Sequence, residues 1–174
     1  AAPATAGRFW SRGWKENLLQ TRERFLEEYE LADMLFVLSE TAAETFRVEL
    51  RGTTFRLVAG ILAGLPGFGV LDGDESLRRR PMARVAAPLV AMGATVAGRA
   101  GTTMAPFAIT GSPTLRAIEH VTLVPSAQVK SCVLLAGLAA TGTTAVREAL
   151  PTRDHTERML RARGVPVRTK LLED

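Results

Sequence analysis

Three polar side chains stand at the start of a helix that is otherwise predicted to be apolar. The turn reads Ser126-Ala127-Gln128-Val129-Lys130, and an apolar run follows it. We expect Ser126 to cap the helix, because a serine side chain accepts a hydrogen bond from a backbone N–H of the first turn. Gln128 lacks the spacing of a capping box, so Gln128 and Lys130 need another role. Their amide and ammonium groups add donors to the unpaired N–H groups of this turn, which predicts an anion-binding site.

A run of three arginines precedes a second predicted helix. Arg78, Arg79 and Arg80 stand before Pro81, and proline favours the first helical position, which makes Arg80 the predicted N-cap residue. Arginine offers no acceptor to the backbone N–H groups, and its charge opposes the helix dipole by about 0.3–1 kcal/mol. A bound carboxylate or phosphate would remove this conflict. A solvated basic turn is the alternative that the run alone leaves open.

Two other predicted helix starts combine donors with cations. Gly52 begins a helix that has Arg56 in its first turn, and Thr152 and Arg153 stand just ahead of another helix. We therefore expect four helix starts to share one anion-binding face. Its ligand should carry more than one anionic group.

The composition is that of one globular domain with a substantial core. The chain has 174 residues, of which 47% are hydrophobic and 23% are charged, and its net charge is +4. The part before Gly52 holds nine acidic and seven basic residues, whereas the rest holds nine acidic and fifteen basic residues. This basic excess indicates an anionic partner. Since the chain has no apolar run of about 18 residues and no signal peptide, we expect a cytoplasmic protein without a membrane partner.

Metal and thiol chemistry are not expected. Cys132, the single cysteine, lies in the apolar helix, where a small buried side chain is the favoured interpretation. His120 and His155 have no metal-ligand partner at helical or turn spacing.

The elements that must position these residues fall into two parts. Lys15 to Leu38 has the apolar spacing of one long amphipathic helix. After Gly52, short helices end in glycine and lead into β-rich segments. These segments are Phe68–Leu71, Ala94–Ala97 and Val165–Lys170. Asp154 and Glu157 have the spacing of a capping box and predict another helix start.

The part after Gly52 also contains pairs of similar segments. Leu57–Gly64 is similar to Leu134–Ala140 at an offset of 77 residues, and Met92–Val96 is similar to Arg163–Val167 at an offset of 71. Two copies of a helix, strand, helix, strand unit of about 70 residues would explain both similarities. Shared composition of apolar helices rich in Ala and Gly is the alternative.

Three long motifs of this part are shared with a known enzyme family. They are Gly73-Asp74-Glu75-Ser76-Leu77-Arg78-Arg79-Arg80-Pro81-Met82, Ser126-Ala127-Gln128-Val129-Lys130-Ser131 with Leu134-Leu135-Ala136-Gly137-Leu138, and Thr152-Arg153-Asp154-His155-Thr156-Glu157-Arg158-Met159-Leu160. In order and separation they closely resemble the family of 5-enolpyruvylshikimate-3-phosphate synthase (EPSP synthase, 3-phosphoshikimate 1-carboxyvinyltransferase). The resemblance runs from about Gly52 to Val167.

The resemblance implies an α/β fold built from repeated βαβαββ units, three in each domain. About two units fit after Gly52, so we expect residues 1–51 to be a helical segment without family resemblance and residues 52–174 to be a partial EPSP-synthase-like domain. A missing unit would expose apolar surface, which predicts self-association unless the segment from Lys15 to Leu38 covers that surface.

The resemblance also implies a reaction, which is transfer of the enolpyruvyl group of phosphoenolpyruvate to shikimate 3-phosphate in the shikimate pathway, without metal or cofactor. The implied ligands of shikimate 3-phosphate are Ser126, Ala127, Gln128, Thr152 and Arg153. The implied residues on the phosphoenolpyruvate side are Gly52, Arg56, Arg80 and Gln128, with Arg80 forming a forked pair of bonds to the carboxylate. Gln128 thereby gains a role as a ligand donor, and Lys130 joins the basic field.

The chain departs from the family in three respects. Leu50-Arg51-Gly52 replaces the family's Asn-Ala-Gly or Asn-Ser-Gly. Its Lys-Ser substrate motif is absent, and so is the second domain that supplies acid and base groups. Because proton transfer by a positioned group typically contributes about 10²- to 10⁴-fold, we expect this chain alone to be inactive or nearly so. A start at Ala1 agrees with a fragment.

Two other functions remain open on sequence grounds. A non-catalytic remnant would bind shikimate 3-phosphate or another anion without turnover. A nucleic-acid-binding module would contact phosphates through Arg78, Arg79, Arg80 and Arg84. We do not expect a nucleic-acid partner, because Phe107 is the only aromatic residue after Phe68 that could stack on bases.

Overall fold

The first structural unit is a mixed sheet covered by helices. The computed structural model describes residues 45–50 and 52–170, so the helix expected at 15–38 lies outside the described residues. The elements of this unit are β1 (Thr45–Leu50), α3 (Gly52–Ala63), β2 (Gly67–Gly73), α4 (Glu75–Arg78), α5 (Ala83–Met92), β3 (Thr95–Gly98), α6 (Arg99–Thr102) and β4 (Met104–Gly111). The strands lie in the order β1-β2-β4-β3, with β1 parallel to β2 and the other two pairs antiparallel. Apart from the short helices α4 and α6, the chain order is strand, helix, strand, helix, strand, strand, and the expected α/β class is confirmed.

The second unit has the chain order strand, strand, helix, strand, strand, helix. It consists of β5 (Leu115–Arg116), β6 (Glu119–Thr122), α7 (Ala127–Gly137), β7 (Ala140–Thr141), β8 (Ala145–Glu148) and α8 (His155–Ala162). Strand β5 pairs with β7 and β6 pairs with β8, both in parallel, as β1 pairs with β2. The β-rich segments expected near Phe68 and Ala94 correspond to β2 and β3.

The strand expected at Val165–Lys170 is wrong, because no strand is assigned within that segment. Its hydrogen bonds are local instead. The Val165 N–H donates to the Leu160 carbonyl at 3.0 Å, and Arg161 Nε donates to the Val167 carbonyl at 2.9 Å. Pro166 has no backbone N–H to contribute to a ladder. These bonds hold the segment against the end of α8.

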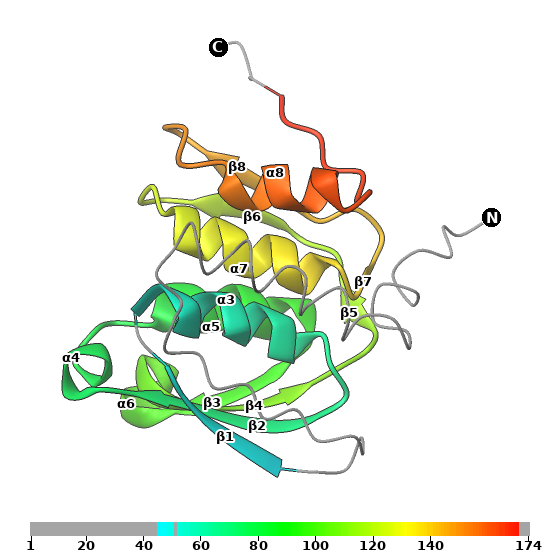
Figure 1. Ribbon diagram of the computed structural model, residues 1–174. Coiled ribbons are helices and arrows are strands. Elements are labelled where there is room, and N and C mark those ends of the chain that lie inside the picture. The colour runs from blue at the N-terminus through cyan, green and yellow to red at the C-terminus, as the bar shows by residue number, and fades with distance from the viewer. Residues whose placement is uncertain (1–44, 51, 171–174) are drawn as a thin grey trace.

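The two units share one core, in which helix α7 packs against helix α3. Figure 1 shows the four-stranded sheet at the bottom, α3 and α5 above it, then α7, and finally β6, β8 and α8 at the top. Phe55 of α3 meets Phe107 of β4 edge to face, with ring centroids 5.4 Å apart. Cys132 of α7 is fully buried, which confirms the expectation of a small buried side chain, and burial raises the pKa of its thiol to about 12.

Within the described residues, no helix has both the length and the hydropathy that crossing a membrane requires.

Candidate functional site

The site is built on the first turns of helices α3 and α7. Helix α3 begins at Gly52, as expected, and this glycine has a φ of +31°, which residues with a side chain rarely adopt. Helix α7 begins after Ser126, whose extended backbone (φ −156°) is typical of an N-cap. The Ser126 hydroxyl accepts a hydrogen bond from the Val129 N–H at 3.4 Å, which confirms that Ser126 caps the helix.

A side-chain hydrogen bond joins these two helix starts. Arg56 Nη1 donates to Gln128 Oε1, across 72 residues of sequence, and also to the Gly52 carbonyl at 3.4 Å. Burial lowers the pKa of Arg56, and the positive charges of Arg80 and Arg84 lower it further. The helix starts therefore carry three guanidinium groups whose mutual repulsion a bound anion would relieve.

Arg80 lies at this site, but it is not the N-cap residue that the sequence predicted. Helix α5 begins at Ala83 with Met82 at the cap position. The reason is a tertiary contact, because the Met82 N–H donates to the Thr103 carbonyl at 2.7 Å and thereby fixes where the helix starts. The predicted conflict between Arg80 and the helix dipole therefore does not arise. A Cβ atom built on Gly52 would lie 3.9 Å from Arg80 Nη1, which places the two residues side by side.

The run of three arginines divides into different environments. Arg78 makes a forked pair of bonds to Asp72, with Nε–Oδ1 at 2.8 Å and Nη2–Oδ2 at 2.6 Å. Arg79 pairs with Glu75 at the surface. Among the described residues, no carboxylate lies within ion-pair distance of Arg80. The phosphate-contacting patch of the nucleic-acid hypothesis thus has two of its guanidinium groups already paired with acids.

Thr152 and Arg153 precede helix α8, as expected, but the predicted capping box is wrong. Asp154 occupies the N-cap position and makes no side-chain capping bond. Glu157 Oε1 instead lies 2.8 Å from Lys130 Nζ. The buried ammonium of Lys130 attracts the Glu157 carboxylate away from the helix terminus, so the spacing of Asp154 and Glu157 did not predict the cap correctly. Arg153 is exposed on the loop between β8 and α8.

Lys130 does not join the basic field that the sequence suggested. Its side chain is only 8% exposed, and its Nζ lies 2.8 Å from both Glu148 Oε2 and Glu157 Oε1. Burial by itself lowers the pKa of Lys130, but the hydrogen bonds to the two carboxylates outweigh this effect and raise it. Burial likewise raises the pKa of Glu148, yet its bonds from Lys130 and Thr152 lower the pKa overall.

The structure thus brings together one part of the predicted site directly and another part through Lys130. Gly52, Arg56, Arg80 and Gln128 form the direct cluster. Ser126 and Ala127 flank Gln128 on α7, and Thr152 reaches the same helix because its carbonyl accepts from Lys130 Nζ at 3.4 Å. No described contact joins Arg153 to these residues. Binding roles for all of them remain predictions.

Two residues of this region were not singled out as ligands or supports by the sequence. Arg84 stands four residues after Arg80, in the first turn of α5, so its spacing carried a signal that was assigned only to a nucleic-acid patch. Glu148, at the end of β8, had no sequence signal, because its partner Lys130 lies on a different element.

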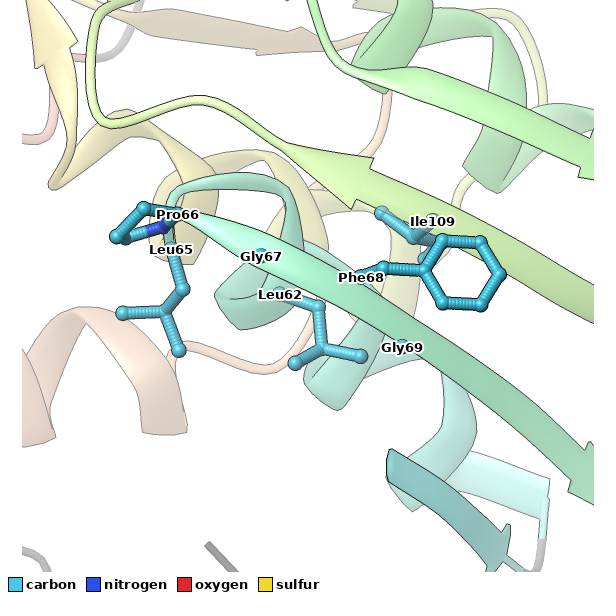
Figure 2. A pocket seen from close by; sticks show the side chains of 7 residues that line it. All are labelled: Leu62, Leu65, Pro66, Gly67, Phe68, Gly69 and Ile109. Carbon is cyan, nitrogen blue, oxygen red and sulfur yellow. The ribbon is translucent and has the colours of Figure 1, made fainter. Parts of the chain in front are cut away.

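A small hollow lies at the other end of helix α3. Figure 2 shows its lining, which is Leu62, Leu65, Pro66, Gly67, Phe68, Gly69 and Ile109. The hollow has a volume of about 10 Å³, which is barely enough for one water molecule. It is therefore too small for a metabolite.

Comparison with known proteins agrees with the motifs. The family model described as EPSP synthase (3-phosphoshikimate 1-carboxyvinyltransferase) matches residues 36–173. A 3-phosphoshikimate 1-carboxyvinyltransferase of Pelotomaculum thermopropionicum is 61% identical over 116 residues, which are 67% of this chain and 27% of that protein. The enzyme of the same name from Bacillus subtilis is 54% identical over 123 residues, which are 71% of this chain and 28% of that protein.

A solved structure gives the same result for the fold. The EPSP synthase of Acinetobacter baumannii superposes with a TM-score of 0.68 and 47% sequence identity, covering 71% of this chain and 28% of that one. The matched part of this chain therefore corresponds to just over a quarter of the length of the relatives.

Proposed function

The chain belongs to the EPSP synthase family, and from this premise we propose that it supplies substrate-binding residues for enolpyruvyl transfer from phosphoenolpyruvate to shikimate 3-phosphate. One observation carries the proposal. Arg56 of α3 and Gln128 of α7 are hydrogen bonded to each other, with Gly52 and Arg80 beside them. Both substrates are anions, and this cluster presents cations and donors at two helix starts.

Each residue has a distinct role in this proposal. Arg80 grips the carboxylate of phosphoenolpyruvate, since a guanidinium matches a carboxylate with two parallel hydrogen bonds. Gly52 lets the ligand approach the backbone, and Arg56 orients Gln128 while it adds positive charge. Shikimate 3-phosphate binds on the adjoining side, and the residues proposed to form that side of the site are Ser126, Ala127, Gln128, Thr152 and Arg153.

The proposed contribution of this chain is binding rather than proton transfer. The cluster around Gln128 consists of guanidinium, amide and hydroxyl groups, none of which exchanges a proton readily near neutral pH. The nearby carboxylates of Glu148 and Glu157 are held by Lys130. We therefore expect the 174-residue chain to bind its ligands without releasing phosphate from them.

Neighbouring arginines provide a matched test. Arg80→Ala should weaken phosphoenolpyruvate binding, measured by calorimetry in the presence of shikimate 3-phosphate, by about tenfold or more, because it removes a charge-assisted forked bond. Arg79→Ala should leave binding unchanged, since Arg79 pairs with Glu75 at the surface. Both changes remove one positive charge, so an equal loss in both variants would point to a diffuse electrostatic effect.

The same titrations contain the outcome that would reject the proposal. A folded chain that binds neither ligand at millimolar concentration would be inconsistent with it. Measurable phosphate release by the chain alone would contradict the separation of binding from proton transfer. Binding of single-stranded nucleic acid that weakens steeply with salt would favour the alternative of a phosphate-contacting patch.

A further inference from the structure

We propose that Lys130, Glu148 and Glu157 form a buried anchor that positions the loop of Thr152 and Arg153, and that Thr152 acts through Glu148 without contacting the ligand. Lys130, Glu148, Glu157 and Thr152 are called the anchor residues below. The inference rests on the proposed function and refines the role of one predicted ligand residue. It also assigns roles to three residues that the proposed site leaves aside.

The anchor joins three elements at one point. Lys130 lies on α7, Glu148 ends β8 and Glu157 lies in the first turn of α8. Lys130 Nζ is 2.8 Å from an oxygen of each carboxylate, and the three side chains are only 8 to 10% exposed. Because the loop from 149 to 154 connects Glu148 to α8, fixing both ends against α7 fixes where the loop can go.

A second contact reinforces the position of α8. Ser131 Oγ donates to the Ala127 carbonyl at 2.7 Å and lies 2.7 Å from Thr156 Oγ1. The hydrogen bond between Ser131 and Thr156 is buried. Ser131 is next to Lys130 in the sequence of α7, and Thr156 is next to Glu157 in the sequence of α8. Two adjacent polar contacts therefore set the register of α8 on α7.

Thr152 is held in the loop by both its side chain and its backbone. Its hydroxyl donates to Glu148 Oε1 at 2.6 Å, and its carbonyl accepts from Lys130 Nζ at 3.4 Å. A hydroxyl has a single hydrogen to donate, and while this hydrogen is bonded to Glu148 it does not serve a phosphate. The exposed guanidinium of Arg153 is the positively charged group that the loop offers to an anion.

Charge supports the same division of roles. The anchor contains two carboxylates and one ammonium, and Glu157 Oε2 is buried without a hydrogen-bond partner among the described residues. A phosphate next to Thr152 would meet this excess negative charge at short range, where the repulsion is weakly screened. One residue further along, Arg153 provides the positive charge that a phosphate needs.

Isosteric substitution of Thr152 separates positioning from contact. Thr152→Val removes the hydroxyl and keeps the shape, so affinity for shikimate 3-phosphate, measured by calorimetry, should fall about tenfold. Thr152→Ser keeps a hydroxyl for Glu148 and should restore most of the affinity. Failure of the serine to rescue, or no change with valine, would overturn the inference.

A double-mutant cycle with Glu148→Ala identifies the route of the effect. If Thr152 acts through Glu148, the variant with both substitutions should bind no more weakly than Glu148→Ala alone. If Thr152 contacts the ligand directly, the two losses should multiply, and the inference is wrong. Urea unfolding of each variant verifies that the compared proteins are folded.

A ligand-free measurement keeps the inference testable if shikimate 3-phosphate does not bind. The backbone amide of Arg153 should have a nitrogen-15 order parameter near that of rigid backbone, about 0.85, and Thr152→Val should lower it towards about 0.6. Thr152→Ser should retain the rigid value. An unchanged order parameter in Thr152→Val would reject the anchor, whereas absent binding with the expected order parameters would reject only the proposed function.

Discussion

At the residue scale, burial decides what a positive charge does in this protein. Arg80 is exposed beside Gly52 and faces no described carboxylate, so its charge is available to a ligand. Lys130 lies only two residues after Gln128 in the sequence, yet its side chain is buried and bonded to two carboxylates. The sequence predicted the same use for both residues because it shows spacing along one helix and cannot show partners on β8 and α8.

Lys130→Met should destabilise the fold strongly. The substitution leaves Glu148 and Glu157 buried without a counter-charge, and breaking a buried ion pair from one side typically costs about 3–5 kcal/mol. Arg79→Met, which breaks the surface pair with Glu75, should cost about 1 kcal/mol or less. Urea unfolding at pH 7 measures the loss of unfolding free energy in each variant. Similar losses in the two variants would mean that the buried cluster contributes no more to stability than the surface ion pair.

The cost of Lys130→Met should also depend on pH. The pKa of Glu148 is lowered from its usual 4.5, so its stabilising effect is complete above that value and is lost as the pH falls through the folded-state pKa. The pKa of Lys130 is raised from 10.5, so its effect is complete below that value and is lost as the pH rises through the folded-state pKa. The difference in unfolding free energy between the original protein and Lys130→Met should therefore be largest between these two pH limits and should become smaller in acid.

At the element scale, helix starts were predictable where local chemistry fixes them. Gly52 and Ser126 mark the starts of α3 and α7 because a strained φ and a capping hydroxyl need only neighbouring residues. The start of α5 was missed by two residues because Met82 bonds to Thr103 on another segment. The strand expected after Gly164 does not form, because residues of this segment bond back to α8, and apolar composition does not reveal that alternative.

The contact between α3 and α7 gives a prediction at this scale. A Cβ atom on Gly60 would lie 2.2 Å from the Cys132 carbonyl oxygen, and this backbone atom cannot move aside without shifting α7. Gly60→Ala should therefore destabilise the fold by several kcal/mol, although alanine favours a helix by about 1 kcal/mol. Because α3 carries Arg56 and α7 carries Gln128, the same shift should weaken ligand binding.

Gly137→Ala is the matched control for this prediction. A Cβ atom there would lie 3.0 Å from the nearest atom, which belongs to the Thr144 side chain and not to the backbone. The neighbour has to move by only a few tenths of an ångström there, so this variant should unfold at a urea concentration much closer to that of the original protein. Equal destabilisation of the two glycine variants would contradict the argument from backbone contact.

At the scale of the whole molecule, the second unit is where the fold departs most from the first. Strands β1 and β2 belong to a four-stranded sheet, whereas β6 and β8 pair only with each other among the described strands. The motifs predicted the family and the α/β class, because both depend on residues close in sequence. They did not predict which of the second unit's apolar residues would be exposed, because that depends on how its strands pair.

Self-association through the second unit is the prediction that belongs to this scale. Leu123 is 92% exposed and Leu150 is 64% exposed, and they follow the paired strands β6 and β8 at the same end. Val121 and Val124 are more than half exposed beside them. Exposed apolar side chains of this size favour contact between molecules, so sedimentation should show association that rises with protein concentration. High salt should not dissociate these assemblies, because the contact between the molecules does not depend on charge.

Substitution decides whether these leucines are responsible. Leu123→Lys combined with Leu150→Lys should abolish the concentration dependence, since two charges would have to be buried in any contact. Val90→Lys, at a half-exposed position on α5, adds charge elsewhere and should leave association unchanged. Association that survives the double substitution, or that Val90→Lys also removes, would place the contact outside this surface.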